Sequence, residues 1–592
     1  MEAISQGQKL FLTRLGIGLA QGLALYLLYR VSEAKAWPAT QGVVFIPLLL
    51  VSLAAPVGLN LSLGAMPWRK ALVWVGIAST IVALLGFFDA WMGASQQLTE
   101  GAIPSAQLIF FGAGGLFIAH ALVTGGVTDH RFMASYHTHF DVAWKLAVQL
   151  ALSVLFVAAF WLLLWLGAGL FGLIRLNFLS DLLAREWFSI PVVAMAAAGA
   201  LHLTDIRPVL VQGARTLALT LLSWLLPLIT LIVAGFVASL PFTGLQALWN
   251  IGRATALLLV AAGALIVLIN AAHQDGAEER MPPRILRLAD SVAAVLTVPL
   301  AVIAAYALTL RVGQHGWTVD RVTVAAIIIV ALAYAGGYAR AAFVRGPWLA
   351  QIESWNFKVS LLALALMTLM FTPLASPLRI SVANQMARLN SGKITPQKFD
   401  YAYLRWEGGR YGQAALAELS RSPHAYTRLA ASDALKQTSR YQPLAPAPEF
   451  LARRITAHPR GARLPESFLN TAWNKSPAGR AGCMTAMNSR CDAIQLDLDG
   501  DGRPEILLFA TGDSTVSVFR MTGVGWSLAA TFEAPCPGML DALRSQKFEV
   551  TPPTSRWNDV VIEGRRLRLD IGADPAVSRA CPKSPPRINQ RR

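Results

Sequence analysis

The sequence is poor in charge, and its few cysteines are confined to one end. Charged residues make up 14% of the chain, against about 25% in soluble domains. Residues 1–482 contain no cysteine, and residues 378–592 contain no apolar run long enough to cross a bilayer. The chain also lacks G-x-S-x-G, Walker and H-E-x-x-H motifs. Nothing in it therefore indicates the common serine hydrolases, P-loop enzymes or zinc proteases.

Long apolar runs are abundant before residue 378. A helix needs about 20 mostly apolar residues to cross a bilayer, and about eleven runs meet that criterion. Buried helices of a soluble protein would be shorter and amphipathic. We therefore predict a polytopic α-helical membrane protein with spans near residues 10–29, 42–62, 70–92, 106–124, 145–173, 188–204, 214–239, 253–272, 289–310, 320–339 and 357–376, making residues 1–377 the transmembrane domain.

A formal net charge of +17 invites comparison with nucleic-acid-binding proteins. No run of Lys and Arg interleaved with aromatic residues is present, so nucleic acid is not expected as a partner. Much of the positive charge flanks the apolar runs, and one set of alternate loops holds twice as many Lys and Arg as the other. This bias predicts a cytoplasmic amino terminus in a bacterial inner membrane. An odd number of spans then places the tail in the periplasm.

All four cysteines, Cys483, Cys491, Cys536 and Cys581, lie in the tail. An even number confined to one soluble segment is typical of disulfides in an oxidising compartment. Three pairings are possible, and the most local one joins Cys483 to Cys491 and Cys536 to Cys581. Four reduced thiols are the alternative. A zinc site is less favoured because no C-x-x-C pair is present.

The composition of the tail changes twice along the chain. Residues 378–440 are predicted to form short helices, one of which opens with Thr395 as N-cap and Pro396 as its first residue. Residues 441–489 are rich in proline and arginine and are predicted to be a linker. Residues 490–592 are predicted to be a small β-rich domain, with strands in AIQLD, PEILLFA, STVSVFRM and WSLAATF and a hairpin in NDVVIEGRRLRLD. The expected tail is therefore α+β.

One loop of the β-rich part carries closely spaced carboxylates. Its alternate side chains can converge on one cation, and glycine permits the sharp turn, so hard oxygen ligands in this number indicate Ca²⁺. A solvated acidic turn is the alternative. The candidate ligands are Asp497, Asp499, Asp501, the carbonyl of Arg503, and Glu505. The loop and the apolar strand after it resemble the short calcium loops of the FG-GAP/VCBS class, although one loop cannot build a propeller.

Two stretches resemble a bacterial membrane family. They are FDVAWKLAVQLALSVLFVAAFWLLLWLGAGLF at residues 140–171 and PLRISVANQMARLNSGKITPQKFDYAYLRWEGGRYG at residues 377–412. Both are similar to the family called domain of unknown function 4153, over roughly residues 10–415. The resemblance implies an inner-membrane protein with no assigned reaction, and it implies no catalytic residues.

A few polar side chains lie inside the apolar runs, where they are functional suspects. His120 and His202 are candidates for a role inside the membrane, and Asp89 and Arg14 stand closer to span ends, where snorkelling to the surface explains them. The polar loop 125–144 adds a weaker candidate. If that loop is extended, His137, His139 and Asp141 could share a transition metal, whereas on a helix they would diverge.

The sequence leaves three classes of function open. A non-enzymatic sensor, scaffold or assembly module fits the large tail and the chemically quiet membrane domain, with membrane lipid and a periplasmic protein as partners. A transporter of a small solute or lipid fits the number of spans. A membrane-surface enzyme would need clustered acid and base residues, and only the loop histidines suggest them. We favour the first class.

Overall fold

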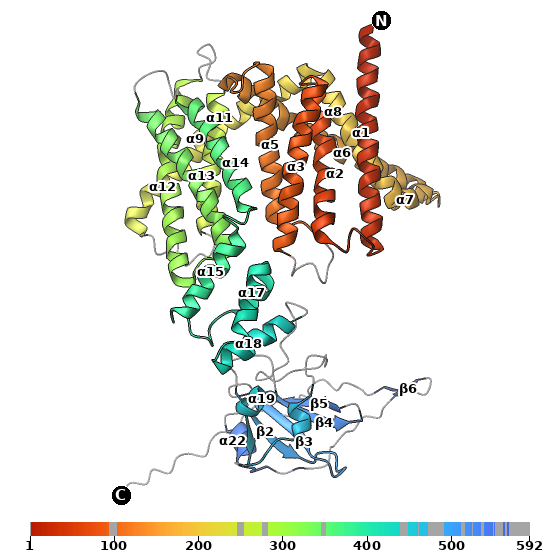
Figure 1. The fold of residues 1–592 in the computed structure, drawn as a ribbon, viewed down its shortest axis with the longest axis vertical. Coiled ribbons are helices and arrows are strands. Elements are labelled where there is room, and N and C mark those ends of the chain that lie inside the picture. Colours follow the sequence, from red (N-terminus) through yellow and green to blue (C-terminus); the bar gives the residue numbers. More distant parts are fainter. Residues whose placement is uncertain are drawn as a thin grey trace. The chain divides into compact units, whose positions relative to one another are not determined.

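The computed structural model describes residues 2–93, 103–244, 254–274, 282–344, 351–437, 448–459, 461–471, 490–510, 515–523, 525–533, 538–548, 550, 560–562 and 565–567. The chain divides into two compact units. The first comprises Met1–Thr395 and Phe399–Leu416, and the second comprises Pro396–Lys398 and Ala417–Arg592. Each unit is described by itself (Figure 1).

The first unit is helical, and eleven of its described helices are long and apolar enough to cross a membrane. The predicted spans are confirmed, with several helices extending beyond the apolar runs. The eleven are α1 (Glu2–Glu33), α2 (Gly42–Ser62), α3 (Trp68–Met92), α5 (Ala106–Thr128), α6 (Tyr136–Leu173), α8 (Glu186–Ile206), α9 (Pro208–Thr243), α11 (Ala254–His273), α12 (Arg284–His315), α13 (Val319–Phe343) and α14 (Ile352–Met370). The short α7 (Phe178–Leu183) precedes α8.

These helices pack in two neighbourhoods. α1 packs against α8 and α2, and α2 packs against α3. α9, α11, α12 and α13 share one apolar core in which Leu265, Ile269, Leu300 and Tyr338 are fully buried. Many other apolar side chains in the spans remain exposed, as expected for helices whose outer faces meet lipid rather than water.

The contact between α1 and α8 depends on small residues. A β-carbon at Gly18 would lie 2.8 Å from the β-carbon of Ala198, and one at Gly22 would collide with the backbone of Pro191. Gly18 and Gly22 are four residues apart and therefore share one face of α1. Their missing side chains let the two helix backbones approach closely, which is a common way of packing helices in membranes.

Short helices follow the last span. They are α15 (Pro377–Asn390), α16 (Tyr401–Glu407), α17 (Gly409–Leu419) and α18 (Ala425–Lys436). The predicted start of α16 at Thr395 and Pro396 was wrong. Asp400 is the N-cap, because its carboxylate accepts the Tyr403 N–H at 2.9 Å, and aspartate is as good a cap as serine or threonine. The predicted stop is confirmed, since Gly408 follows the last residue of α16.

The second unit contains a five-stranded sheet in the order β1-β2-β3-β4-β5. Its strands are β1 (Ile455–His458), β2 (Cys491–Leu496), β3 (Glu505–Ala510), β4 (Thr515–Thr522) and β5 (Gly525–Glu533). β1 is parallel to β2, and the remaining neighbours are antiparallel. The predicted hairpin is also present, as β6 (Val560–Ile562) paired with β7 (Arg565–Leu567).

Part of the predicted linker belongs to this sheet domain. α19 (Pro448–Arg454), β1 and α20 (Glu466–Leu469) all fall within residues 441–489. Leu451 and Phe468 are 0% exposed in the core on one face of the sheet, and Phe468 packs edge-on against Phe519 and Trp526. α22 (Met539–Arg544) packs on β2. The prediction of a linker was based on the many proline and arginine residues. It overlooked the apolar residues between them, which form part of the core.

Candidate functional site

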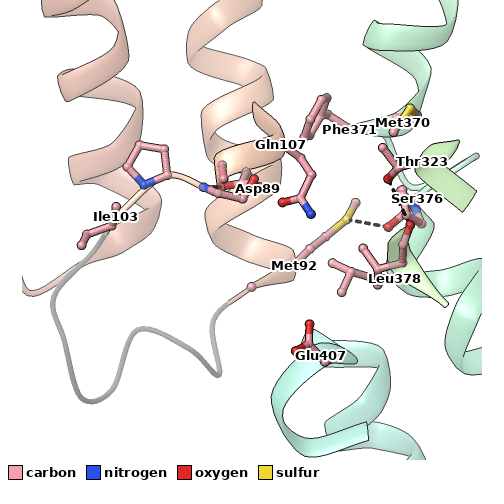
Figure 2. A pocket seen from close by; sticks show the side chains of 17 residues that line it. Asp89, Met92, Ile103, Gln107, Thr323, Met370, Phe371, Ser376, Leu378 and Glu407 are labelled. Carbon is pink, nitrogen blue, oxygen red and sulfur yellow. Dashed lines mark hydrogen bonds between the residues drawn. The ribbon is translucent and has the colours of Figure 1, made fainter. Parts of the chain in front are cut away.

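A polar cavity lies where several spans end, and we call it the Asp89 cavity. It has a volume of about 350 Å³. Its wall comes from the end of α3, the starts of α5 and α13, the end of α14, and α15 to α17 (Figure 2). The polar side chains that line it include Asp89, Gln107, Thr323, Ser376 and Glu407. Lysine, arginine and histidine are absent from the described residues of its lining.

Asp89 fixes the start of α5. Its carboxylate accepts the Ser105 backbone N–H at 2.9 Å and the Ser105 hydroxyl at 2.6 Å. Ser105 is in turn the N-cap of α5, accepting the Leu108 N–H. The predicted intramembrane candidate Asp89 thus has a clear structural task at the edge of the Asp89 cavity. Opposite it, the Ser376 hydroxyl donates to the Met92 sulfur at 3.2 Å (Figure 2).

An apolar cavity of about 520 Å³ adjoins it, and we call this the Trp74 cavity. Its wall is built from α2, α3, α5 and the early part of α6. Ile103 and Pro104 line both cavities, so the two share a wall just before α5. The predicted candidate His120 lines the Trp74 cavity and accepts the indole N–H of Trp74 at 3.0 Å through Nδ1.

An ion-pair cluster joins α1, α6 and α8. Arg14 is 1% exposed, and its Nη2 donates to Asp205 Oδ2 at 2.8 Å. Lys145 reaches the other oxygen of Asp205 at 3.3 Å, and the ring of His202 lies 3.4 Å from Arg14 Nη1. The snorkelling explanation of Arg14 was wrong, because the guanidinium is buried against a carboxylate. His202 belongs to this cluster.

A second polar network joins four helices at the same ends of the spans. Tyr338 donates to Asn356 at 2.7 Å, and Asn270 donates to Tyr338 at 2.6 Å. Asn356 closes the ring by donating to Asn270 at 2.6 Å and to Tyr136 at 3.2 Å. Tyr136, Asn270 and Asn356 line a cavity of about 710 Å³. Such networks fasten membrane helices to one another.

The loop histidines do not form the metal site that an extended loop would allow. His137, His139 and Asp141 all lie in the first turns of α6. The side chain of His139 therefore leaves the helix in a different direction from those of His137 and Asp141, which are four residues apart and share one face. Asp141 pairs with Arg215 at 2.5 Å and lies 3.9 Å from His137. His139 instead stacks on Phe357 and lines the 710 Å³ cavity. The segment is therefore helical, and the extended loop that the metal hypothesis required is not formed.

Sequence reasoning missed the most deeply buried carboxylate of the described spans. Asp290 of α12 is 0% exposed, and its two oxygens have no hydrogen-bond partner among the described residues. It lies close to the start of its span, where an acidic residue reads as a surface group. Asp205 and Lys145 are charged residues at the ends of apolar runs and were likewise taken for surface groups, whereas Tyr338 is uncharged and was not considered. A rule that flags every ionisable residue within two turns of a span end would have found the first two and Asp290.

The structure brings three of the predicted calcium ligands together. Asp497, Asp499 and Asp501 each offer a carboxylate oxygen, and these atoms lie within 4.8 Å of one another. All three are exposed. Asp497 also accepts the N–H groups of Gly500 and Gly502, at 2.8 and 3.0 Å.

Glu505 and Arg503 have other contacts in the same loop. Glu505 is buried, and its carboxylate accepts the Leu498 N–H at 2.8 Å, which ties the loop to the start of β3. Glu505 is therefore not one of the three clustered carboxylates. The backbone N–H of Arg503 donates to Asp501 at 2.7 Å. Among the cysteines, Cys491 is buried in β2, whereas Cys483, Cys536 and Cys581 lie outside the described residues.

Eleven long apolar helices among the described residues, together with a folded mixed-sheet tail, define a polytopic helical membrane protein. The family model described as Domain of unknown function (DUF4153) matches residues 22–419, and the chain belongs to that family. The resemblance of the membrane domain is thereby confirmed. No curated protein and no solved structure matches the chain.

Proposed function

We propose that this protein is a non-enzymatic inner-membrane module of the sensor, scaffold or assembly type, which presents its tail domain to a protein partner in the periplasm. The observation that carries the proposal is the contrast between its two units. In the membrane unit, the charged side chains of Arg14, Asp141 and Asp205 form ion pairs between helices. The tail unit has a core of its own and a sheet of five strands.

The proposed orientation of the protein in the membrane rests on the unequal distribution of Lys and Arg between the two ends of the spans. The ends of the spans near Lys9, Arg69, Arg131, Arg284 and Arg340 carry the larger share of Lys and Arg, which favours a cytoplasmic position for them. With eleven spans, the tail then lies on the opposite face. A bacterial inner membrane is the membrane to which this charge rule applies most directly.

Two disulfides in the tail are part of the proposal. In the chain-entropy model, closing the roughly 46-residue loop between Cys536 and Cys581 would stabilise the tail by about 4 kcal/mol. Mass spectrometry of non-reduced peptides from protein purified out of its native membrane tests this. Four free thiols would contradict both the disulfides and the oxidising compartment.

A calcium ion in the loop 497–505 is also part of the proposal. The three clustered carboxylates supply hard oxygen ligands, which suit Ca²⁺. Bound calcium would neutralise their mutual repulsion and hold the loop beside β3. Its role would be structural, because the cluster lies in the tail and no candidate base or nucleophile joins it among the described residues.

Photo-crosslinking from defined positions tests the proposed partner. A photoreactive residue at Met521 or Met539, which are 43% and 42% exposed on the tail unit, should capture the same protein in intact cells. The matched control is Leu217 of α9, which is 61% exposed in a span and should capture lipid. Tail positions that capture no protein, or capture the same set as Leu217, would contradict the proposal.

A transporter of a small solute or lipid is the second candidate, and one observation favours it. The Asp89 cavity lies at one set of span ends, whereas the 710 Å³ cavity lies at the other set. Transport needs access from both faces. The test is solute uptake or lipid flipping by the purified protein in vesicles. Activity that is lost when a bulky side chain fills either cavity would favour a transporter over the non-enzymatic module.

A further inference from the structure

His120 of α5 gives the Trp74 cavity a hydrogen-bond donor in a fixed position. The indole N–H of Trp74 donates to His120 Nδ1 at 3.0 Å. Because an indole can only donate, Nδ1 carries no proton, and the proton of the neutral imidazole lies on Nε2. Among the described residues, none accepts a hydrogen bond from Nε2. His120 lines the cavity, and Nε2 is not one of the fully enclosed polar atoms that lack a partner, so its N–H is open to the cavity.

The rest of the Trp74 cavity is apolar and uncharged. Its described lining contains no Asp, Glu, Lys or Arg, and its polar side chains are those of Trp74, Ser79 and His120. Leu53 and Ile109 line the cavity and are 44% and 52% exposed, so it opens toward the surface that meets lipid. A volume of about 520 Å³ is in the range typical of ligand sites. The cavity therefore suits a neutral, largely apolar molecule that enters from the bilayer.

The depth of the donor disfavours a phospholipid. At 1.5 Å per residue, His120 lies about 12 Å along α5 from its end at Thr128, and Trp74 about 9 Å along α3 from its start at Trp68. A phospholipid whose ester carbonyl reached this depth would bring its phosphate, only a few bonds away, into an uncharged lining, which is costly. A carbonyl in a molecule without charged groups carries no such cost.

We propose that the Trp74 cavity binds an isoprenoid quinone, with one ring carbonyl accepting the Nε2–H of His120 and the isoprenoid tail running along the apolar lining toward the bilayer. A quinone has carbonyl acceptors, no charge and a long apolar tail, so each part of the molecule meets a matching part of the cavity. Its flat ring also suits the aromatic side chains of Trp74 and Phe117, which both line the cavity. The site lies in the membrane unit and goes beyond the proposed function, which depends on the tail.

Photolabelling of the intact chain tests the site. The protein is placed in phospholipid vesicles with an isoprenoid benzoquinone that carries a photoreactive group on its tail, and labelled peptides are identified. The label should concentrate on α2, α3 and α5 around the Trp74 cavity. Unlabelled benzoquinone should compete about tenfold better than the same tail on a benzene ring without carbonyls, the difference expected for one hydrogen bond. Equal competition by the two, or label spread evenly over the spans, would overturn the proposal and leave phospholipid acyl chains as the occupants.

A double variant separates the hydrogen bond from the shape of the cavity. His120→Phe alone would leave the indole N–H of Trp74 without its acceptor. His120→Phe together with Trp74→Phe removes both partners, which is less costly than leaving one unpaired. In this variant the benzoquinone and the benzene compound should compete equally well, because the donor is gone. A retained preference for the quinone in the folded double variant would contradict the role of His120.

A bulky side chain inside the cavity tests binding itself. Gly112→Phe should abolish the specific labelling, since Gly112 lines the cavity and the nearest side-chain atom would be 3.8 Å from a β-carbon there, an ordinary contact. Gly76→Phe is the matched control, because Gly76 is exposed on α3 and outside the lining. Thermal unfolding in detergent shows which variants fold. Should Gly112→Phe fail to fold, the double variant decides the proposal, whereas unchanged labelling in a folded Gly112→Phe variant would contradict the site.

Discussion

Arg14 of α1 and Asp205 of α8 are 191 residues apart in the sequence and 2.8 Å apart in the structure. The guanidinium is 1% exposed and the carboxylate 15% exposed. Lys145 completes the neutralisation of Asp205 from α6. One carboxylate therefore ties three helices together in surroundings where an unpaired charge is expensive.

Removing this carboxylate should destabilise the membrane unit strongly. Asp205→Asn leaves Arg14 buried beside a neutral amide, and breaking a buried pair in this way costs about 3–5 kcal/mol. Thermal unfolding of the purified variant in detergent should show the loss. Asp320→Asn at the start of α13 is a suitable control, since Asp320 has no described ion pair. An equal loss of stability for both substitutions would show that the Arg14–Asp205 ion pair does not stabilise the membrane unit.

The close approach of α1 and α8 predicts a steric effect. Gly22→Leu would place a side chain where the backbone of Pro191 lies, so the two helices must separate. We expect a marked drop in melting temperature and faster proteolysis. Gly16→Leu on the same helix is the control, because nothing lies within 4 Å of a β-carbon there. A drop of the same size for Gly16→Leu would mean that the α1–α8 contact is not the cause.

The inclusion of residues 448–471 in the tail domain predicts a core defect. Phe468→Ala removes a ring that is 0% exposed against Phe519 and Trp526, which should cost about 3–5 kcal/mol. Phe532→Ala, at a side chain that is 40% exposed, should cost much less. Limited proteolysis of the intact protein reports the difference, and equal cleavage of both variants would return these residues to a linker.

The loop 497–505 predicts dependence on calcium. At 100 times its dissociation constant, a ligand that binds only the folded state adds about 2.7 kcal/mol, so the tail should unfold at higher temperature with Ca²⁺ than with chelator. Asp499→Ala removes one of three clustered carboxylates and should abolish the difference. Lys547→Ala, remote in sequence from the loop, should leave it intact. Identical unfolding of the wild-type protein with calcium and with chelator would falsify a stabilising site.

Much of the membrane unit could be predicted from the sequence, because a bilayer imposes a length and an apolarity on each span that a single helix must meet alone. Which helices pack against one another could not be predicted from the sequence. Arg14 and Asp205 each stand near a span end, and nothing local distinguishes a paired charge from one that snorkels. The β-strands after residue 490 were predictable from short runs of apolar, β-branched and aromatic residues separated by turn residues. The burial of Leu451 and Phe468 was not predictable, because a few apolar residues among prolines show neither the periodicity of a helix nor that of a strand.

The candidate site was predicted only in fragments. Asp89 and His120 were flagged as costly polar residues in spans, and each lines one of two adjacent cavities. Glu407 was not flagged, because it lies beyond the last span and joins the Asp89 cavity only through the fold of α16. The three clustered carboxylates of the loop 497–505 were predictable because their spacing is local.

The side of the membrane on which the tail lies tests the account most directly. Reporters are fused to the full-length chain after Arg592 and, for comparison, to a chain that ends after Phe343, the last residue of the tenth span. The account predicts active alkaline phosphatase and a dark cytoplasm-dependent fluorescent protein after Arg592, and the reverse after Phe343. A fluorescent, phosphatase-inactive fusion after Arg592 would place the tail in the cytoplasm and contradict the proposed function.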